Sequence, residues 1–101
     1  MSIGDLVGIP TDVQRDVELG IKILKDGGCT DVYVLGSVAE GRTHPESDID
    51  FAVRGCPPEQ FFMLQGQLLM ELARSSDLID LDVDPDLSKF LEHEATLVHV
   101  G

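Results

Sequence analysis

Two short apolar segments, Asp31 to Leu35 (DVYVL) and Asp48 to Val53 (DIDFAV), bracket a turn-rich connection over residues 36–47. Both segments are rich in β-branched or aromatic residues, which is typical of buried strands. Two isolated strands are only marginally stable in water, so other elements of the chain must cover them. The remaining sequence is therefore expected to supply helices and further strands around this pair.

A helix is predicted before the first strand. Thr11 and Gln14 have the spacing of a capping box, and apolar residues then recur at helical spacing as far as Leu24. The pair Gly27-Gly28 is expected to end this helix, because glycine readily takes the backbone conformation of a helix C-terminus.

The second half of the chain repeats the alternation of helix and strand. Pro57-Pro58 predicts the start of a helix. A strand is expected over residues 78–83 (LIDLDV), followed by a short helix with Leu87, Phe90 and Leu91, and by an edge strand over residues 96–100. Residues expected to be buried in the Pro58 helix are Phe61, Phe62, Met63, Leu64, Leu68, Leu69, Met70 and Leu72.

The predicted order is helix, strand, strand, helix, strand, helix, strand. It indicates an α+β fold, an α/β sandwich in which helices cover one face of a small mixed sheet. A chain of 101 residues has room for one core, so residues 1–101 are expected to form a single domain.

The charge balance restricts the classes of partner. With 19 acidic and 7 basic residues, the net charge is -12, which argues against nucleic-acid binding and against an anionic membrane surface. A basic protein partner or a divalent cation fits this charge better, although acidity can also serve solubility alone. No signal peptide or membrane span is recognisable, and two cysteines without metal spacing, Cys29 and Cys56, suit a reducing cytoplasm.

The connection after the first strand begins with Gly36-Ser37. Glycine permits a sharp turn or close approach to a phosphate, and a helix starting at Ser37 would offer backbone N–H groups and a hydroxyl to phosphate oxygens. Taken alone, Gly36 could equally be a turn residue and Ser37 a helix cap.

Asp48 and Asp50 are separated by one residue on the second strand, so both side chains should leave the same face while Ile49 points into the core. Aspartate is disfavoured in strands. Two neighbouring carboxylates repel each other, and a divalent cation such as Mg²⁺ relieves the repulsion while also taking substrate phosphates as ligands. A solvated acidic strand face is the alternative interpretation.

A third carboxylate is expected from the segment LIDLDVD. Asp80, Asp82 and Asp84 lie at a spacing of two. Asp80 is the first choice because it is flanked by Ile79 and Leu81, and Asp82 is the second. His44, His93 and His99 share no ligand spacing and are expected at the surface or at a sheet edge.

The stretch GSVAEGRTHPESDIDFAV resembles the GSx10DxD signature of the nucleotidyltransferase superfamily related to DNA polymerase β. Ten residues separate Ser37 from Asp48, and the resemblance is clearest over residues 31–54. The short chain is similar to the minimal nucleotidyltransferases, many of which are antitoxins paired with HEPN-domain toxins.

The resemblance implies roles for individual residues. Gly36 and Ser37 would bind nucleotide phosphates, and Asp48 and Asp50 would hold two Mg²⁺ ions, with Mn²⁺ as a substitute. Asp80 would complete the metal site and help to deprotonate the acceptor.

The implied activity is transfer of a nucleoside monophosphate from a nucleoside triphosphate, with ATP favoured, to a hydroxyl of a partner protein, with the chain as an antitoxin-like component. Related chains often carry arginine at the positions of Val38 and Glu40, so nucleotide affinity is expected to be weak. The rival hypothesis is an acidic, non-catalytic module that neutralises a basic partner, and the sequence leaves open whether the chain forms a homodimer.

Overall fold

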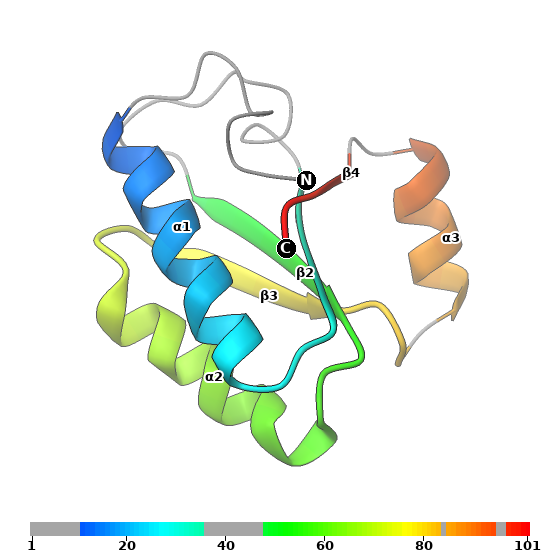
Figure 1. Ribbon diagram of the computed structural model, residues 1–101. Coiled ribbons are helices and arrows are strands. Elements are labelled where there is room, and N and C mark those ends of the chain that lie inside the picture. Colours follow the sequence, from blue (N-terminus) through cyan, green and yellow to red (C-terminus); the bar gives the residue numbers. More distant parts are fainter. Residues whose placement is uncertain (1–10, 36–47, 84, 95–96) are drawn as a thin grey trace.

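The computed structural model describes residues 11–35, 48–83, 85–94 and 97–101. Helices and strands follow one another in the predicted order (Figure 1). The elements are α1 (Thr11–Asp26), β1 (Asp31–Leu35), β2 (Ile49–Arg54), α2 (Pro58–Glu71), β3 (Ser76–Asp80), α3 (Pro85–Glu94) and β4 (Leu97–His99).

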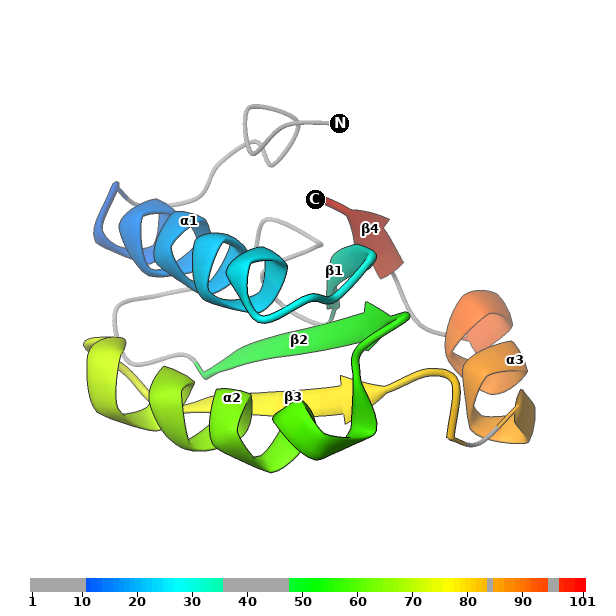
Figure 2. The ribbon, with the colours of Figure 1, turned by 60° about the horizontal axis from the view of Figure 1, so that its bottom comes forward.

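The strands of the described residues form one mixed sheet with the order β3-β2-β1-β4. β1 is antiparallel to β2 and β4, whereas β2 and β3 are parallel. The predicted α+β fold with a small mixed sheet is therefore confirmed. Because β2 and β3 run in the same direction, their first residues lie at one end of the sheet and their last residues at the other, beside α3 (Figure 2).

Helices α1 and α2 cover one face of the sheet (Figures 1 and 2). Their apolar sides meet Val32, Val34, Ile49, Phe51 and Val53, all fully buried in the main core cluster. A Cβ atom on Gly20 of α1 would collide with the Phe51 ring, so glycine lets the helix approach the sheet closely. α1 ends as predicted, with Gly28 at a φ of +99°.

The other face of the sheet has a smaller apolar cluster. Leu91 of α3 packs there with Leu35, Ala52 and Leu81. Thus two helices cover one face as expected, and α3 contributes to the opposite face. No helix among the described residues is long and apolar enough to cross a membrane.

Two local predictions were wrong. The third strand covers Ser76–Asp80 and not residues 78–83, so it starts two residues earlier and ends at Asp80. In α2, only Leu64 and Leu68 are buried, because only the side of the helix that faces the sheet is covered. The apolar side chains predicted to be buried but found exposed are Phe62, Met63, Leu69, Met70 and, in α3, Phe90.

Candidate active site

The sheet register brings Asp50 and Asp77 side by side. Asp50 of β2 lies opposite Leu35 of β1 on one side and opposite Asp77 of β3 on the other. Directly paired residues of neighbouring strands share a face, and that face alternates along each strand. The buried neighbour Ile49 faces the α1 and α2 core, so Asp50 and Asp77 lie on the opposite face.

The surroundings of Asp50 disfavour its charge. Partial burial is the largest cause that raises the pKa of the Asp50 carboxyl, followed by the negative charges of Asp77 and Asp48 and a side-chain hydrogen bond with Asp77. Across the described ranges, no Lys, Arg or His forms an ion pair with any of these three carboxylates. Asp48, Asp50 and Asp77 therefore form a group of neighbouring negative charges, which we call the carboxylate group.

The donor chemistry of the carboxylate group fits a hard divalent cation. Mg²⁺ at phosphate-handling sites is commonly held by one or two carboxylates together with phosphate oxygens and water. Asp50 and Asp77, paired on adjacent strands, meet that requirement, with the charge of Asp48 nearby. Within the part of the chain that the structure describes, no three or more His, Cys, Asp or Glu side chains are grouped closely enough to hold a metal ion together, so a cation here would depend on two carboxylates and on ligands from outside the chain.

Asp80, the sequence-based first choice for the third carboxylate, does not join this group. It lies opposite Val53, three residues along β3 from Asp77, which corresponds to about 10 Å of strand and to the other face of the sheet. Its charge instead contributes to raising the pKa of the buried Cys29 thiol, which burial and the neighbouring Cys56 raise more strongly, to about 12. Cys29 belongs to the core beneath α1 and α2, which agrees with this placement.

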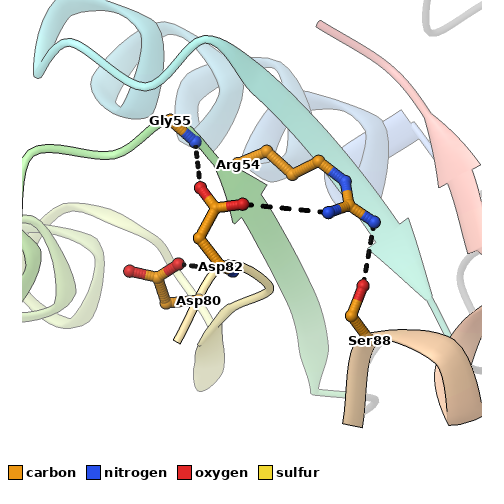
Figure 3. A network of polar contacts seen from close by, with 5 residues as sticks. All are labelled: Arg54, Gly55, Asp80, Asp82 and Ser88. Carbon is orange, nitrogen blue, oxygen red and sulfur yellow. Dashed lines mark hydrogen bonds and ion pairs between the residues drawn. The ribbon is translucent and has the colours of Figure 1, made fainter. Parts of the chain in front are cut away.

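Asp80 and Asp82 take part in a separate polar network at the far end of the strands (Figure 3). Asp80 Oδ1 accepts a hydrogen bond of 3.0 Å from the backbone N–H of Asp82. Asp82 Oδ2 accepts one of 2.6 Å from the N–H of Gly55, and Asp82 Oδ1 lies 3.8 Å from Nη1 of Arg54. Arg54 donates in turn to the Ser88 hydroxyl of α3 at 2.9 Å. This network joins the turn after β2 to α3.

Sequence reasoning missed Asp77. The strand was predicted to begin at Leu78, which left Asp77 outside it, although the motif DLID places an aspartate on each face of an extended strand. That alternation could have shown that only one of Asp77 and Asp80 can share a face with Asp50. The parallel pairing with β2 identifies Asp77 as that residue.

The predicted phosphate-binding residues Gly36 and Ser37 lie outside the described residues, as do Val38, Glu40 and His44. The last described residue before them, Leu35, is the β1 partner of Asp50, so β1 ends next to the carboxylate group. Of the other histidines, His93 is exposed and His99 lies on edge strand β4, where its Nε2 is 3.0 Å from Asp31 Oδ1.

The arrangement of two adjacent strands carrying neighbouring carboxylates agrees with a sequence comparison. The model of the family described as "Polymerase beta, Nucleotidyltransferase" matches residues 21–99, and the chain belongs to this family. No curated protein sequence matches the chain significantly.

Solved structures with a similar fold come from toxin–antitoxin complexes. A toxin–antitoxin crystal structure with AMP-PNP has a TM-score of 0.63 and 23% identity, over 91% of this chain and 75% of that chain. The MntA–HepT toxin–antitoxin complex has a TM-score of 0.60 and 22% identity, over 87% and 73%. The tri-AMPylated HEPN toxin of Shewanella oneidensis with its MNT antitoxin has a TM-score of 0.60 and 21% identity, over 90% and 74%. The chain thus has the nucleotidyltransferase fold of these antitoxins.

Proposed function

We propose that this chain transfers a nucleoside monophosphate from a nucleoside triphosphate to a hydroxyl of a partner protein. The observation that carries the proposal is the carboxylate group, in which Asp50 and Asp77 are paired side by side on adjacent strands and form no ion pair with a cation among the described residues. Groups that repel each other in this way are costly unless function retains them, and perturbed carboxyl groups are common at active sites. Membership of the nucleotidyltransferase family supports the same reaction.

In this proposal Asp50 and Asp77 bind the metal directly and Asp48 adds negative charge beside it, with Asp77 in the role that the sequence analysis gave to Asp80. Mg²⁺, or Mn²⁺ in its place, supplies positive charge that offsets the charge of the phosphates when it is bound. Gly36 and Ser37 bind phosphate oxygens, and Asp77 receives the proton of the acceptor hydroxyl. The hydroxyl oxygen forms a bond to the α-phosphorus, the bond from that phosphorus to the bridging oxygen breaks, and pyrophosphate leaves.

ATP is the favoured nucleotide and a toxin tyrosine the favoured acceptor. Similar folds occur with AMP-PNP and with a tri-AMPylated HEPN toxin. We therefore propose that the chain acts as an antitoxin that modifies a HEPN-type partner in the cytoplasm. The replacement of two arginines by Val38 and Glu40 supports weak nucleotide binding by the chain alone, because a carboxylate near phosphates repels them by about 1 kcal/mol per charge in water at 4 Å.

The test is a mass measurement on a HEPN-type partner co-expressed with this chain. The partner should gain one nucleoside monophosphate per modified hydroxyl, and Asp50→Asn or Asp77→Asn should abolish the gain. Asp82→Asn is the matched control, since it changes the same residue type just beyond the same strand, outside the apolar groove lined by Phe62 and Ile79, and should leave the modification intact. An unmodified partner in the presence of the parent chain and Mg²⁺-ATP would refute the proposal.

The alternative is a non-catalytic module that neutralises a basic partner by contact. The net charge of -12 favours it, because such a surface attracts a basic protein without any chemistry. The double variant Asp48→Asn, Asp50→Asn separates the two functions. Neutralisation that survives this change supports the binding module, and neutralisation that disappears with it supports the enzyme.

A further inference from the structure

Helix α2 exposes an apolar surface on the side turned away from the core. Phe62 is 80% exposed, Leu69 59% and Met70 87%, whereas Leu64 and Leu68 of the same helix are buried. Phe62, Gly66, Leu69 and Met70 recur at intervals of three and four, so they follow one side of the helix. We call these four residues the α2 surface. Contiguous apolar surface of this kind commonly marks a protein contact.

Gly66 lies in the middle of the α2 surface. A Cβ atom added there would meet no atom of the described residues within 4 Å, so nothing in that part of the chain requires glycine at this position. Glycine in a helix interior costs up to about 1 kcal/mol relative to alanine. A small residue between large apolar ones allows the backbone of a second helix to approach closely.

A groove continues the α2 surface toward the edge of the sheet. Phe62 also lines this groove, of about 500 Å³, together with Ile79 of edge strand β3 and with Val83 and Leu87 beyond it. Ile79 is two residues from Asp77 along β3 and shares its face. A protein that packs on α2 and extends around the β3 edge therefore reaches the carboxylate group.

The charges around this surface select the kind of occupant. α2 carries Glu59 and Glu71 and has no Lys or Arg, and Asp80 is the one charged side chain among the described residues that line the groove. A second copy would oppose these carboxylates with identical ones, and each copy has a net charge of -12. Complementary charge requires a partner with Lys or Arg beside its apolar residues.

We propose that the α2 surface and its groove dock a helix of a basic partner protein, apolar on one side and flanked by Lys or Arg. This inference rests on the proposed function, because it names the surface through which the protein that carries the acceptor hydroxyl is held. Docking beside the β3 edge brings the acceptor to Asp77.

Fluorescence anisotropy with a labelled amphipathic helical peptide of Leu and Lys tests the proposal. The double variant Phe62→Ser, Leu69→Ser should bind this peptide at least about tenfold more weakly than the parent, as expected when interface anchors are lost. Phe90→Ser is the matched control, since Phe90 of α3 is 59% exposed like Leu69, and it should bind as the parent does. A Leu and Glu peptide of the same length should bind the parent at least about tenfold more weakly than the Leu and Lys peptide.

A second variant, Gly66→Arg, keeps the test independent of folding. The site has room for a side chain and arginine favours helix, so the fold should persist while bulk and positive charge weaken binding. Glu59→Lys should weaken binding of the basic peptide more than Glu18→Lys on the exposed side of α1. Equal losses in the Phe90 control, or equal binding of the acidic peptide, would overturn the proposal. So would a parent chain that sediments as a dimer and becomes monomeric in the double variant, since a second copy would then be the occupant.

The docking proposal and the proposed function fail separately. Asp50→Asn should leave peptide binding unchanged, because the carboxylate group lies on the other face of the sheet from α2. Peptide binding without any nucleotide transfer refutes the reaction and leaves the docking surface. Transfer to a co-expressed HEPN-type partner that is unaffected by the Phe62 and Leu69 changes refutes the docking surface and leaves the reaction.

Discussion

Aspartates lie at both ends of the parallel strands β2 and β3. At the end where the strands begin, Asp50 faces other carboxylates, whereas at the far end, beside α3, the aspartates contact backbone donors and an arginine. At the far end, Asp82 accepts the N–H of Gly55 and pairs with Arg54, and Asp80 accepts the N–H of Asp82. At the near end, where β2 and β3 begin, Asp50 lies beside another carboxylate, Asp77, and burial followed by the negative charges of Asp77 and Asp48 raises the pKa of Asp50. Backbone N–H donors stabilise Asp80 and Asp82, and Arg54 pairs with Asp82, so the negative charge at the far end has a structural role.

The near end has no such structural explanation. Negative groups held together without compensation lower stability, and the proposed function would supply the compensation through a bound cation. The lesson is that an aspartate in a strand identifies a site only through what surrounds it. The sequence analysis considered Asp80 and Asp82 and left out Asp77, whereas the pairing of β3 with β2 places Asp77 beside Asp50.

The largest expected effect is on stabilisation by a bound metal, which should depend on Asp77 at one end of β3 and not on Asp80 at the other. Mg²⁺ or Mn²⁺ at one hundred times its dissociation constant should stabilise the parent by about 2.7 kcal/mol, because it binds only the folded state. Asp77→Asn should lose most of this stabilisation, and Asp80→Asn should keep it. Thermal unfolding of the three proteins with and without metal measures the difference. If Asp77→Asn kept the stabilisation by metal and Asp80→Asn lost it, Asp80 and not Asp77 would be the metal ligand.

The second prediction concerns pH without metal. Burial, then the charges of Asp77 and Asp48, raise the pKa of Asp50 in the folded protein, whereas the unfolded chain has the usual value of about 3.9. Between these two pKa values the folded state binds more protons, so its stability falls as pH rises through the raised pKa. Asp50→Asn removes this penalty and should raise the free energy of unfolding at neutral pH, on the order of 1 kcal/mol.

Urea denaturation across a pH series tests that sign. The advantage of Asp50→Asn should be complete above the raised pKa and should disappear as the pH falls below about 3.9, where the carboxyl is neutral in both states. Glu18→Gln, at an exposed position of α1, serves as the control for removing one negative charge. An Asp50→Asn variant less stable than the parent at neutral pH would mean that a favourable partner stabilises the Asp50 charge.

Local sequence patterns predicted some elements of the fold and not others. The order of elements, the strand Asp31–Leu35 and the end of α1 followed from local patterns and turn residues. The bounds of β3 did not, because the strand begins with two polar residues, Ser76 and Asp77, and because the alternating pattern IDLDV continues past its end at Asp80, where Leu81 remains buried. Its pairing with β2 decides which aspartate faces Asp50, and that pairing is a contact between distant parts of the sequence.

Helix α2 shows the same limit for burial. Apolar residues occur around most of its circumference, so the sequence could not indicate which side meets the sheet. Leu64 and Leu68 face the core, and Phe62, Leu69 and Met70 face outward. The prediction that all of them are core was wrong, and the excess of apolar residues is what the docking proposal explains.

The smallest expected effect tests the far end of the strands. Asp82→Ala removes both the acceptor for the Gly55 N–H and the partner of Arg54, and Asp82→Asn keeps an acceptor oxygen but removes the charge. The side chain of Asp82 is 51% exposed and the Arg54 contact is 3.8 Å, so the ion pair itself contributes at most about 1 kcal/mol. Gly55 has a φ of +68°, and the hydrogen bond from its N–H to Asp82 stabilises this turn. A buried hydrogen bond to a charged group contributes about 1.5 kcal/mol or more, and this exposed one contributes less.

Asp82→Asn should therefore cost a few tenths of a kcal/mol and Asp82→Ala about 1 kcal/mol in chemical unfolding, and only the difference between Asp82→Asn and the parent should shrink at high salt. Neither variant should change the stabilisation by metal, because the contacts of Asp82 lie at the end of the strands away from Asp50. A loss of metal stabilisation in Asp82→Asn equal to that in Asp77→Asn would show that the two ends of β3 act on one site. Their separation into a structural end and a functional end would then be wrong.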